Sequence, residues 1–257
     1  MFWNRERESD HTVMKISGGK NPQTKVVKAS VLNSIKVDII SQILKPGQLV
    51  HEDELASRYG ISRTPIREIL RMLEHEDLVR IVPKVGVFVS EMTPKDIEEV
   101  LEIRTWLEPA AAKSAALKAT EQQLDRFHVI DAQLSLAVEK QDSILSFEAD
   151  RRLHDLILVA AGNERSRRII NSLMGQIYRI RFISRHKPGR IETTVAEHKK
   201  IVSAILNRRP DEAEEAMRSH LANTRKLFLP STEMEVQFET LVRKSVQLKL
   251  RSDTDFP

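Results

Sequence analysis

At 257 residues the chain is long enough for two domains or for one large one. Its hydrophobic fraction of 40%, charged fraction of 30% and net charge of +4 are ordinary for a globular protein. Because it contains no cysteine, disulfides, a thiolate nucleophile and a cysteine-ligated metal are all excluded. No apolar run approaches the ~20 residues that span a bilayer, and the charged N-terminus lacks the apolar core of a signal peptide. We therefore expect a cytoplasmic protein with no membrane partner.

The first part of the chain predicts a disordered arm followed by two short helices. Residues 1–25 are polar and have no hydrophobic period, which is typical of disorder. In the stretch from Leu55 to Leu70, Gly60 stands where a helix end needs a left-handed residue, and Ser62 is placed to cap a second helix. Helix, glycine turn and helix is the layout that places a recognition helix in the DNA major groove.

The predicted second helix carries three arginines at a spacing of four residues, Arg63, Arg67 and Arg71. Residues four apart lie on one face of a helix, so the three form a basic ridge that can face an anionic surface. Taken alone, such a ridge is more typical of a solvated face, and acidic and basic residues nearly balance across residues 21–92. The arrangement of the arginines, rather than net charge, favours DNA binding.

A small hairpin is predicted directly after the second helix. Residues 78–82 and 87–89 are apolar and β-branched, and the tip between them carries Lys84, which is placed to reach the minor groove. Residues 26–91 as a whole resemble the winged helix of the GntR family of bacterial transcription regulators. The resemblance lies in Glu54–Ala56, Gly60–Glu68 and Gly86–Val89. It implies DNA contacts from Ser62, Arg63, Thr64, Arg67, Lys84 and Gly86, whereas an arginine that touches DNA in some relatives is replaced here by Asp53.

Residues 92–229 predict an antiparallel all-helical bundle. Helix starts are indicated at Thr93, Thr120, Asp142, Asn163 and Pro210, with a further helix from about Ile191 to Asn207. We expect about six helices of roughly 16–25 residues joined by short loops. Residues 230–257 form either a short extra helix or a mobile tail. The fold class is thus mainly α: an N-terminal winged helix-turn-helix with a small β-hairpin wing, then the bundle.

Several ionisable residues fall on apolar faces of the predicted bundle helices. Asp150 and His154 are four residues apart on one helix, while His198 and His220 each lie in the apolar stripe of another. Burial of such groups is costly unless they are paired or bound to a metal, and one divalent ion would satisfy all four. Imidazole and carboxylate ligands suit zinc, our first choice, as well as nickel, manganese or iron. The alternative is that each histidine is hydrogen-bonded in the core.

The bundle region resembles the FCD ligand-binding domain that follows the winged helix in one GntR subfamily. The matching pieces are Arg104–Ala112, Asp150–His154, Ala161–Asn163, Glu197–His198 and Met217–Leu221. The resemblance implies that Asp150, His154, His198 and His220 bind a metal and that Arg104 contacts the carboxylate of an effector. We assign Glu108 to the same effector site, where it would hold Arg104 in place. The alternative is a simple buried ion pair between these two residues.

Together these features predict a metabolite-responsive transcription regulator rather than an enzyme. The expected partners are palindromic operator DNA, bound as a homodimer, and a small carboxylate or sugar-acid effector. Two rival functions remain open from the residues alone. The metal set could be catalytic, although no general acid or base other than Glu108 is apparent nearby. Alternatively, the bundle could serve only to dimerise an architectural DNA-binding protein.

Overall fold

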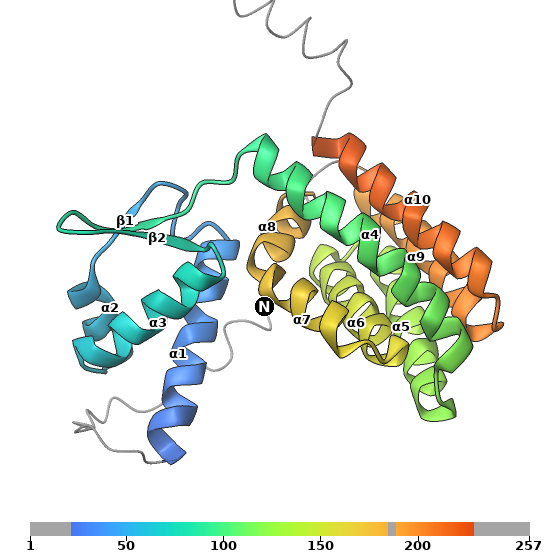
Figure 1. Cartoon of the computed structure of the whole chain (residues 1–257), viewed down its shortest axis with the longest axis horizontal. Helices are drawn as coiled ribbons and strands as arrows, with labels where there is room; N and C mark the ends of the chain where they lie inside the picture. The colour runs from blue at the N-terminus through green and yellow to red at the C-terminus, as the bar shows by residue number, and fades with distance from the viewer. Residues whose placement is uncertain (1–21, 185–188, 229–257) are drawn as a thin grey trace, which may run out of the picture. The chain divides into compact units, whose positions relative to one another are not determined.

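The computed structural model describes residues 22–184 and 189–228, and in them ten helices and three short strands (Figure 1). Internal contacts divide the described residues into two units, residues 22–92 with 172–179 and residues 93–171 with 180–184 and 189–228. Residues 1–21 of the expected arm and the whole expected tail lie outside the described residues. The fold class is confirmed, since a winged helix-turn-helix is followed by a helical bundle.

The first unit contains three helices and a three-stranded antiparallel sheet. The helices are α1 (Pro22–Ile40), α2 (Glu52–Tyr59) and α3 (Arg63–His75), and the strands are β1 (Leu49–Val50), β2 (Val79–Val82) and β3 (Gly86–Val89). The sheet order is β1-β3-β2, and β2 pairs with β3 from Val79 opposite Val89 to Val82 opposite Gly86. The predicted hairpin is thus extended by β1, and α1 begins within the range that we expected to be disordered.

Helix α3 is amphipathic and fixes the core of the winged helix. Its buried residues, Ile66, Ile69, Leu70 and Leu73, follow the spacing of one helix face. They pack with apolar residues of α1 and of the sheet, among them Ile35 and Val87. The polar face of α3 is therefore turned to the solvent.

The turn between α2 and α3 has the geometry that its glycine predicts. Gly60 has a φ of 64°, in the left-handed region, and closes α2. The N–H of Ile61 donates to the carbonyl of Ala56 at 3.1 Å, which satisfies one of the last carbonyls of the helix. Ser62 occupies the cap position of α3, but its side chain makes no capping hydrogen bond, contrary to expectation.

Seven further helices complete the described chain. They are α4 (Pro94–Lys118), α5 (Glu121–Glu139), α6 (Ser143–Ala161), α7 (Glu164–Ser172), α8 (Met174–Ser184), α9 (Arg190–Leu206) and α10 (Pro210–Phe228). The predicted starts at Thr93 and Thr120 are capping boxes, and Asp142 caps α6. One expectation was wrong. The fourth helix, which was expected to start at Asn163, is divided by a turn at Leu173 into two short helices, α7 and α8.

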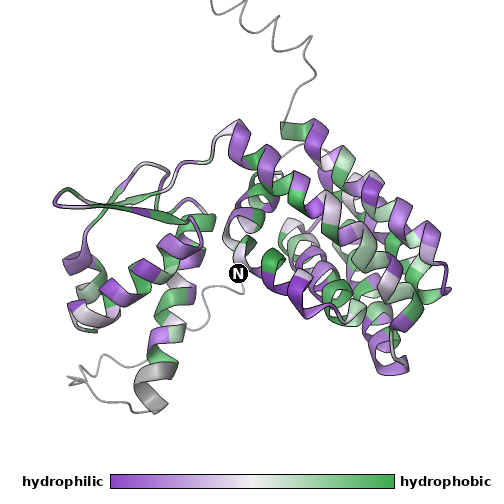
Figure 2. Ribbon diagram, viewed as in Figure 1, coloured by the Kyte–Doolittle hydropathy of each residue, from purple (hydrophilic) through white to green (hydrophobic). Residues whose placement is uncertain are grey.

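In the second unit, α4 packs along α10 and α6, and α9 packs against α10 and α5. Figure 2 shows hydrophobic and hydrophilic residues alternating around these helices, as amphipathic helices of a bundle require. The interior is not purely apolar, because Arg104, Glu108, His154, His198 and His220 are all buried in it. Three of them, His154, His198 and His220, form the candidate metal centre.

Candidate DNA-binding surface and metal centre

The outward face of the winged helix carries the residues that sequence reasoning assigned to DNA. Ser62, Arg63, Thr64 and Arg67 are exposed, while the next apolar position of α3, Ile66, is completely buried. Because α3 is held by its apolar face, these side chains project from a rigid element rather than from a loop. The arrangement suits a helix that enters the major groove.

Both leading arginines of α3 are paired with acidic residues of the first turn of α2. Arg67 Nε lies 2.7 Å from Glu52 Oε2, and Arg63 forms an ion pair with Asp53. The two arginine side chains remain 62% and 59% exposed. Exposed ion pairs are worth only about 0–1 kcal/mol, so DNA phosphates or base edges can displace the carboxylates. Asp53, which stands where some relatives carry an arginine, thus restrains Arg63.

The wing presents Lys84 at an exposed tip, with a left-handed φ of 64°. Gly86 has a φ of 149°, and a Cβ at this position would lie 2.7 Å from the Leu49 side chain. Glycine is favoured here because other residues are strained at this φ, and because the Leu49 side chain would have to move to admit a Cβ. Gly86 thus has a structural role, and its contact with DNA stays a prediction.

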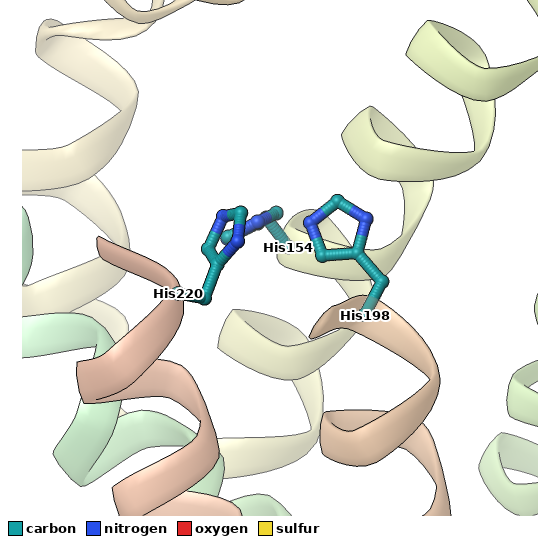
Figure 3. Close-up of side chains that lie close together, drawn as sticks. All are labelled: His154, His198 and His220. Carbon is teal, nitrogen blue, oxygen red and sulfur yellow. The ribbon is translucent and has the colours of Figure 1, made fainter. Parts of the chain in front are cut away.

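Three buried histidines from three helices meet in the interior of the bundle (Figure 3). The ring centroid of His198 lies 4.5 Å from that of His220 and 5.4 Å from that of His154. One ligand nitrogen from each of the three lies within 4.8 Å of the others. The sequence-predicted fourth ligand, Asp150, is adjacent, since its Oδ1 lies 3.5 Å from His154 Nε2. The structure therefore brings the three predicted histidine ligands together and places the fourth predicted ligand, Asp150, beside one of them.

Two carboxylates orient these histidines from outside the cluster. Glu108 Oε2 lies 2.5 Å from His154 Nδ1, and Glu197 Oε2 lies 2.8 Å from His220 Nδ1. A histidine that donates one N–H to a carboxylate presents its other nitrogen, here Nε2, to a metal. Glu197 had no role in our sequence prediction, because its partner lies on another helix, 23 residues later in the chain.

Three buried ring nitrogens of the cluster lack hydrogen-bond partners within the described residues. This holds for Nε2 of His154 and for both ring nitrogens of His198. Burial, and then the proximity of His220, hold the pKa of His198 well below its ordinary value. Burial likewise lowers the pKa of His154 and holds that of His220 well below its usual range. Neutral imidazoles with free lone pairs are what a metal needs.

The donor set fits a divalent metal ion. Two nitrogens that bind one ion at about 2.1 Å lie no more than about 4.2 Å apart, so the three rings need only draw slightly closer. Asp150 is held ionised, because burial, which would raise its pKa, is outweighed by Arg181, whose Nε lies 3.1 Å from the carboxylate. Three histidines and one carboxylate could hold zinc, nickel, manganese or iron.

A small cavity lined by several charged and hydroxyl side chains borders the cluster. It is lined by residues of α4, α6, α8, α9 and α10, including Arg104, Asp150, Arg181, Arg190, Thr194 and His220. Arg104 is buried and held by Glu108, with Nε 2.6 Å from Oε1 and Nη2 3.3 Å from Oε2. Glu108 does not line the cavity, because its carboxylate is engaged by Arg104 and His154. Arg181, Arg190 and Thr194 had no assigned role in our sequence prediction.

Comparison with known proteins places both units in one family. Residues 28–89 match the family model of bacterial regulatory proteins of the gntR family, and residues 99–223 match that of the FCD domain. The chain is 31% identical over 218 residues to the Uxu operon regulator of Haemophilus influenzae, covering 76% of this chain and 79% of the relative. The chain belongs to the GntR family.

Other relatives of this GntR regulator agree with the assignment. It is 28% identical to the HTH-type transcriptional repressor RspR of Escherichia coli, over 81% of this chain and 91% of that protein. The solved structure of Escherichia coli McbR/YncC has the same fold, with a TM-score of 0.68, 20% identity, and coverage of 79% of this chain and 96% of that one. None of the described helices is long and apolar enough to cross a membrane.

Family membership confirms that the protein is a transcription regulator with a DNA-binding helix-turn-helix, and not an enzyme. The rival in which the histidine cluster is a catalytic centre is therefore set aside. The roles of individual residues in DNA and metal binding stay predictions, and two experiments address them.

Replacing Arg67 with Ala is expected to weaken operator binding by roughly 1–3 kcal/mol, because a contact to a base or phosphate is lost. Glu52→Gln should have the opposite effect, since it frees Arg67 and removes a negative charge from the DNA-facing surface. Fluorescence anisotropy at matched salt measures both. Arg126→Ala, which removes an exposed arginine of α5, is the control. Wild-type affinity in Arg67→Ala would show that α3 is not the recognition helix.

Purified protein is expected to carry up to one divalent ion per chain, measured by elemental analysis. His198→Ala and His220→Ala should each lower the metal content and abolish the rise in melting temperature on adding metal. That rise corresponds to about 2.7 kcal/mol when the free ion is at 100 times its Kd. His128→Ala, at an exposed position of α5, is the control. Full metal occupancy in the His198→Ala, His220→Ala double mutant would contradict the site.

Proposed function

We propose that the protein is a one-component regulator that binds palindromic operator DNA as a homodimer and senses a small carboxylate or sugar acid beside a metal in its helical domain. The observation that carries the proposal is the buried histidine cluster next to a cavity lined by Arg104. A core histidine trio without a ligand would leave several buried nitrogens unsatisfied, at a cost of about 1–3 kcal/mol each. A bound metal ion would be the partner of these nitrogens.

The metal ligands would be Asp150, His154, His198 and His220. A bound divalent ion supplies positive charge and, when it is six-coordinate, positions that a carboxylate oxygen of the effector can occupy. This makes the cluster a receptor for an acid as well as a structural centre.

Arg104 supplies the second contact for the same effector. Glu108 engages Nε and Nη2 of the guanidinium, which leaves other N–H donors of Arg104 to face the cavity. The ion pair also prevents the buried arginine from turning away, so the cation is already oriented before an acid arrives. Because the negative charge of Glu108 lies close by, Arg104 favours a singly charged carboxylate over a doubly charged group at its own position.

Operator binding as a homodimer is supported by the size of the winged helix and by the surface of α4. One small winged helix makes few base contacts, so two copies are needed for useful specificity. Trp106 and Leu117 are 65% and 60% exposed, and residues eleven positions apart lie on nearly the same face of a helix. A second copy of the chain is the partner that we propose for this face of α4.

In the sensing test, operator affinity is measured against the concentration of small carboxylic and sugar acids, with divalent metal present. Arg104→Ala is expected to keep its metal content and its operator affinity but to lose the response to the effector. Arg104→Lys should rescue little, because an ammonium cannot make a two-pronged contact with a carboxylate. Lys118→Ala, at an exposed position on the same helix, is the control.

Two results of this test would count against sensing at this site. An unchanged dose response in Arg104→Ala would reduce Arg104 to the structural partner of Glu108. If no acid altered operator affinity in the wild-type protein, the architectural alternative would be favoured instead.

The dimer is tested by replacing Trp106 with Glu, which places a charge in the proposed α4 interface. We expect the molar mass in solution, measured by light scattering, to fall from that of a dimer towards that of a monomer, and operator affinity to fall with it. Val129→Glu changes a comparably exposed apolar residue of α5 and is the control. Dissociation by Val129→Glu but not by Trp106→Glu would place the interface elsewhere.

A further inference from the structure

Arg190, the first residue of α9, is a buried cation at the wall of the cavity. Only 8% of the residue is exposed, yet its Nε has no hydrogen-bond partner among the described residues. Its Nη2 donates one long hydrogen bond, 3.3 Å, to Thr224 Oγ1. One turn further along α9, the hydroxyl of Thr194 is also buried in the cavity wall and also lacks a partner. The Arg190 guanidinium and the Thr194 hydroxyl thus lie in the same cavity wall, and each has an atom without a hydrogen-bond partner among the described residues.

The carboxylate nearest to Arg190 does not neutralise it well. Glu197 Oε2 lies 3.9 Å from Nη1 of the arginine, too far for a hydrogen bond. The same carboxylate is already used by His220, at 2.8 Å, and by Asn223, at 3.0 Å. Burial lowers the pKa of Arg190, which reflects the cost of holding this charge away from water. A buried charge with poor pairing is stabilised when an anion joins it.

We infer that the cavity takes a small diacid, with one acid group at the metal and Arg104 and the second anionic group at Arg190 and Thr194. The inference rests on the proposed sensing function and specifies its effector. The second group is a carboxylate or a phosphate, because the Arg190 guanidinium and the Thr194 hydroxyl supply donors that either anion accepts. The Thr224 hydroxyl is not available as a donor, because it already donates to the carbonyl of His220. A monoacid would leave the Nε of Arg190 without a hydrogen-bond partner.

The geometry limits the length of such an acid. The same oxygen of Glu197 lies 3.9 Å from Arg190 Nη1 and 2.8 Å from His220 Nδ1. The second anionic subsite, at Arg190, is therefore close to the histidine cluster. The cavity is also small, about 30 Å³, which is room for little more than a water or two. Lining side chains must therefore move to admit an acid, and a short diacid requires much less movement than a long acyl chain.

Arg190 could instead act only as a link between α9 and α10 through Thr224. In that role Arg190 would contribute to the stability of the fold but would have no effect on which acid the cavity prefers. The two roles are separated by the preference for diacids over matched monoacids, because a general loss of stability weakens both kinds of acid alike.

The test is isothermal titration of the metal-loaded full chain with two matched pairs of acids, succinate with butyrate and phosphoglycolate with glycolate. The wild-type protein is expected to bind at least one diacid tenfold or more tightly than its matched monoacid. The pair that shows the preference identifies the second group as carboxylate or phosphate. Arg190→Met, which keeps the alkyl stem but removes the charge, should abolish the preference and leave monoacid affinity within about twofold. Thr194→Val should reduce the preference severalfold.

Three results would overturn the inference. These are equal affinity for diacids and monoacids in the wild-type protein, an intact preference in Arg190→Met, and an equal loss of both kinds of acid in Arg190→Met and Thr194→Val. Arg104→Ala is the comparison variant, because it should weaken all acids alike. If the wild-type protein bound none of the four acids, the sensing function itself would fail with the inference, which distinguishes that outcome from the other three.

Discussion

The cost of burying polar and charged groups governs the helical domain. Arg104, Glu108, His154, His198 and His220 are almost completely buried there, where an apolar core would be easier to build. Each of these groups loses water on folding, and removing one partner from such a pair typically costs several kcal/mol. The local arrangement follows from this constraint, since Glu108 serves both Arg104 and His154 while Glu197 serves His220.

The two domains of this GntR regulator use carboxylates in opposite ways. On the winged helix, the pairs of Glu52 with Arg67 and of Asp53 with Arg63 are exposed. Such pairs contribute little stability, so little free energy would be lost if DNA phosphates replaced the carboxylates. In the bundle, the carboxylate of Glu108 is buried and fixed, and burial, which would raise its pKa, is outweighed by Arg104 and His154, which hold the pKa well below its usual range. Exchangeable pairs suit a surface that must search DNA, whereas fixed pairs suit a site that must be preorganised for one ligand.

Local patterns in the sequence predicted the fold class and the family, because their signals lie within a few residues. Gly60 sets a helix end, the arginines repeat every four residues, and Asp150 and His154 share one helix face. Strand β1 was missed, since two residues are too short for a period to show. Glu197 and Arg190 were missed for another reason. Their roles depend on partners or a cavity formed by other helices, and no spacing along the chain reveals which helix faces will meet.

In the proposed function, Glu108 links metal binding to effector binding. One of its oxygens contacts His154 Nδ1 and both contact the guanidinium of Arg104. A metal on Nε2 of His154 would strengthen the Nδ1–H donor and so draw Glu108 more firmly into place. The position of Arg104 would then be better defined for the acid that bridges it and the ion. Thermodynamic linkage makes this coupling reciprocal. If a bound metal raises the affinity for the effector by some factor, the bound effector raises the affinity for the metal by the same factor. A regulator built in this way responds fully only when both ligands are present.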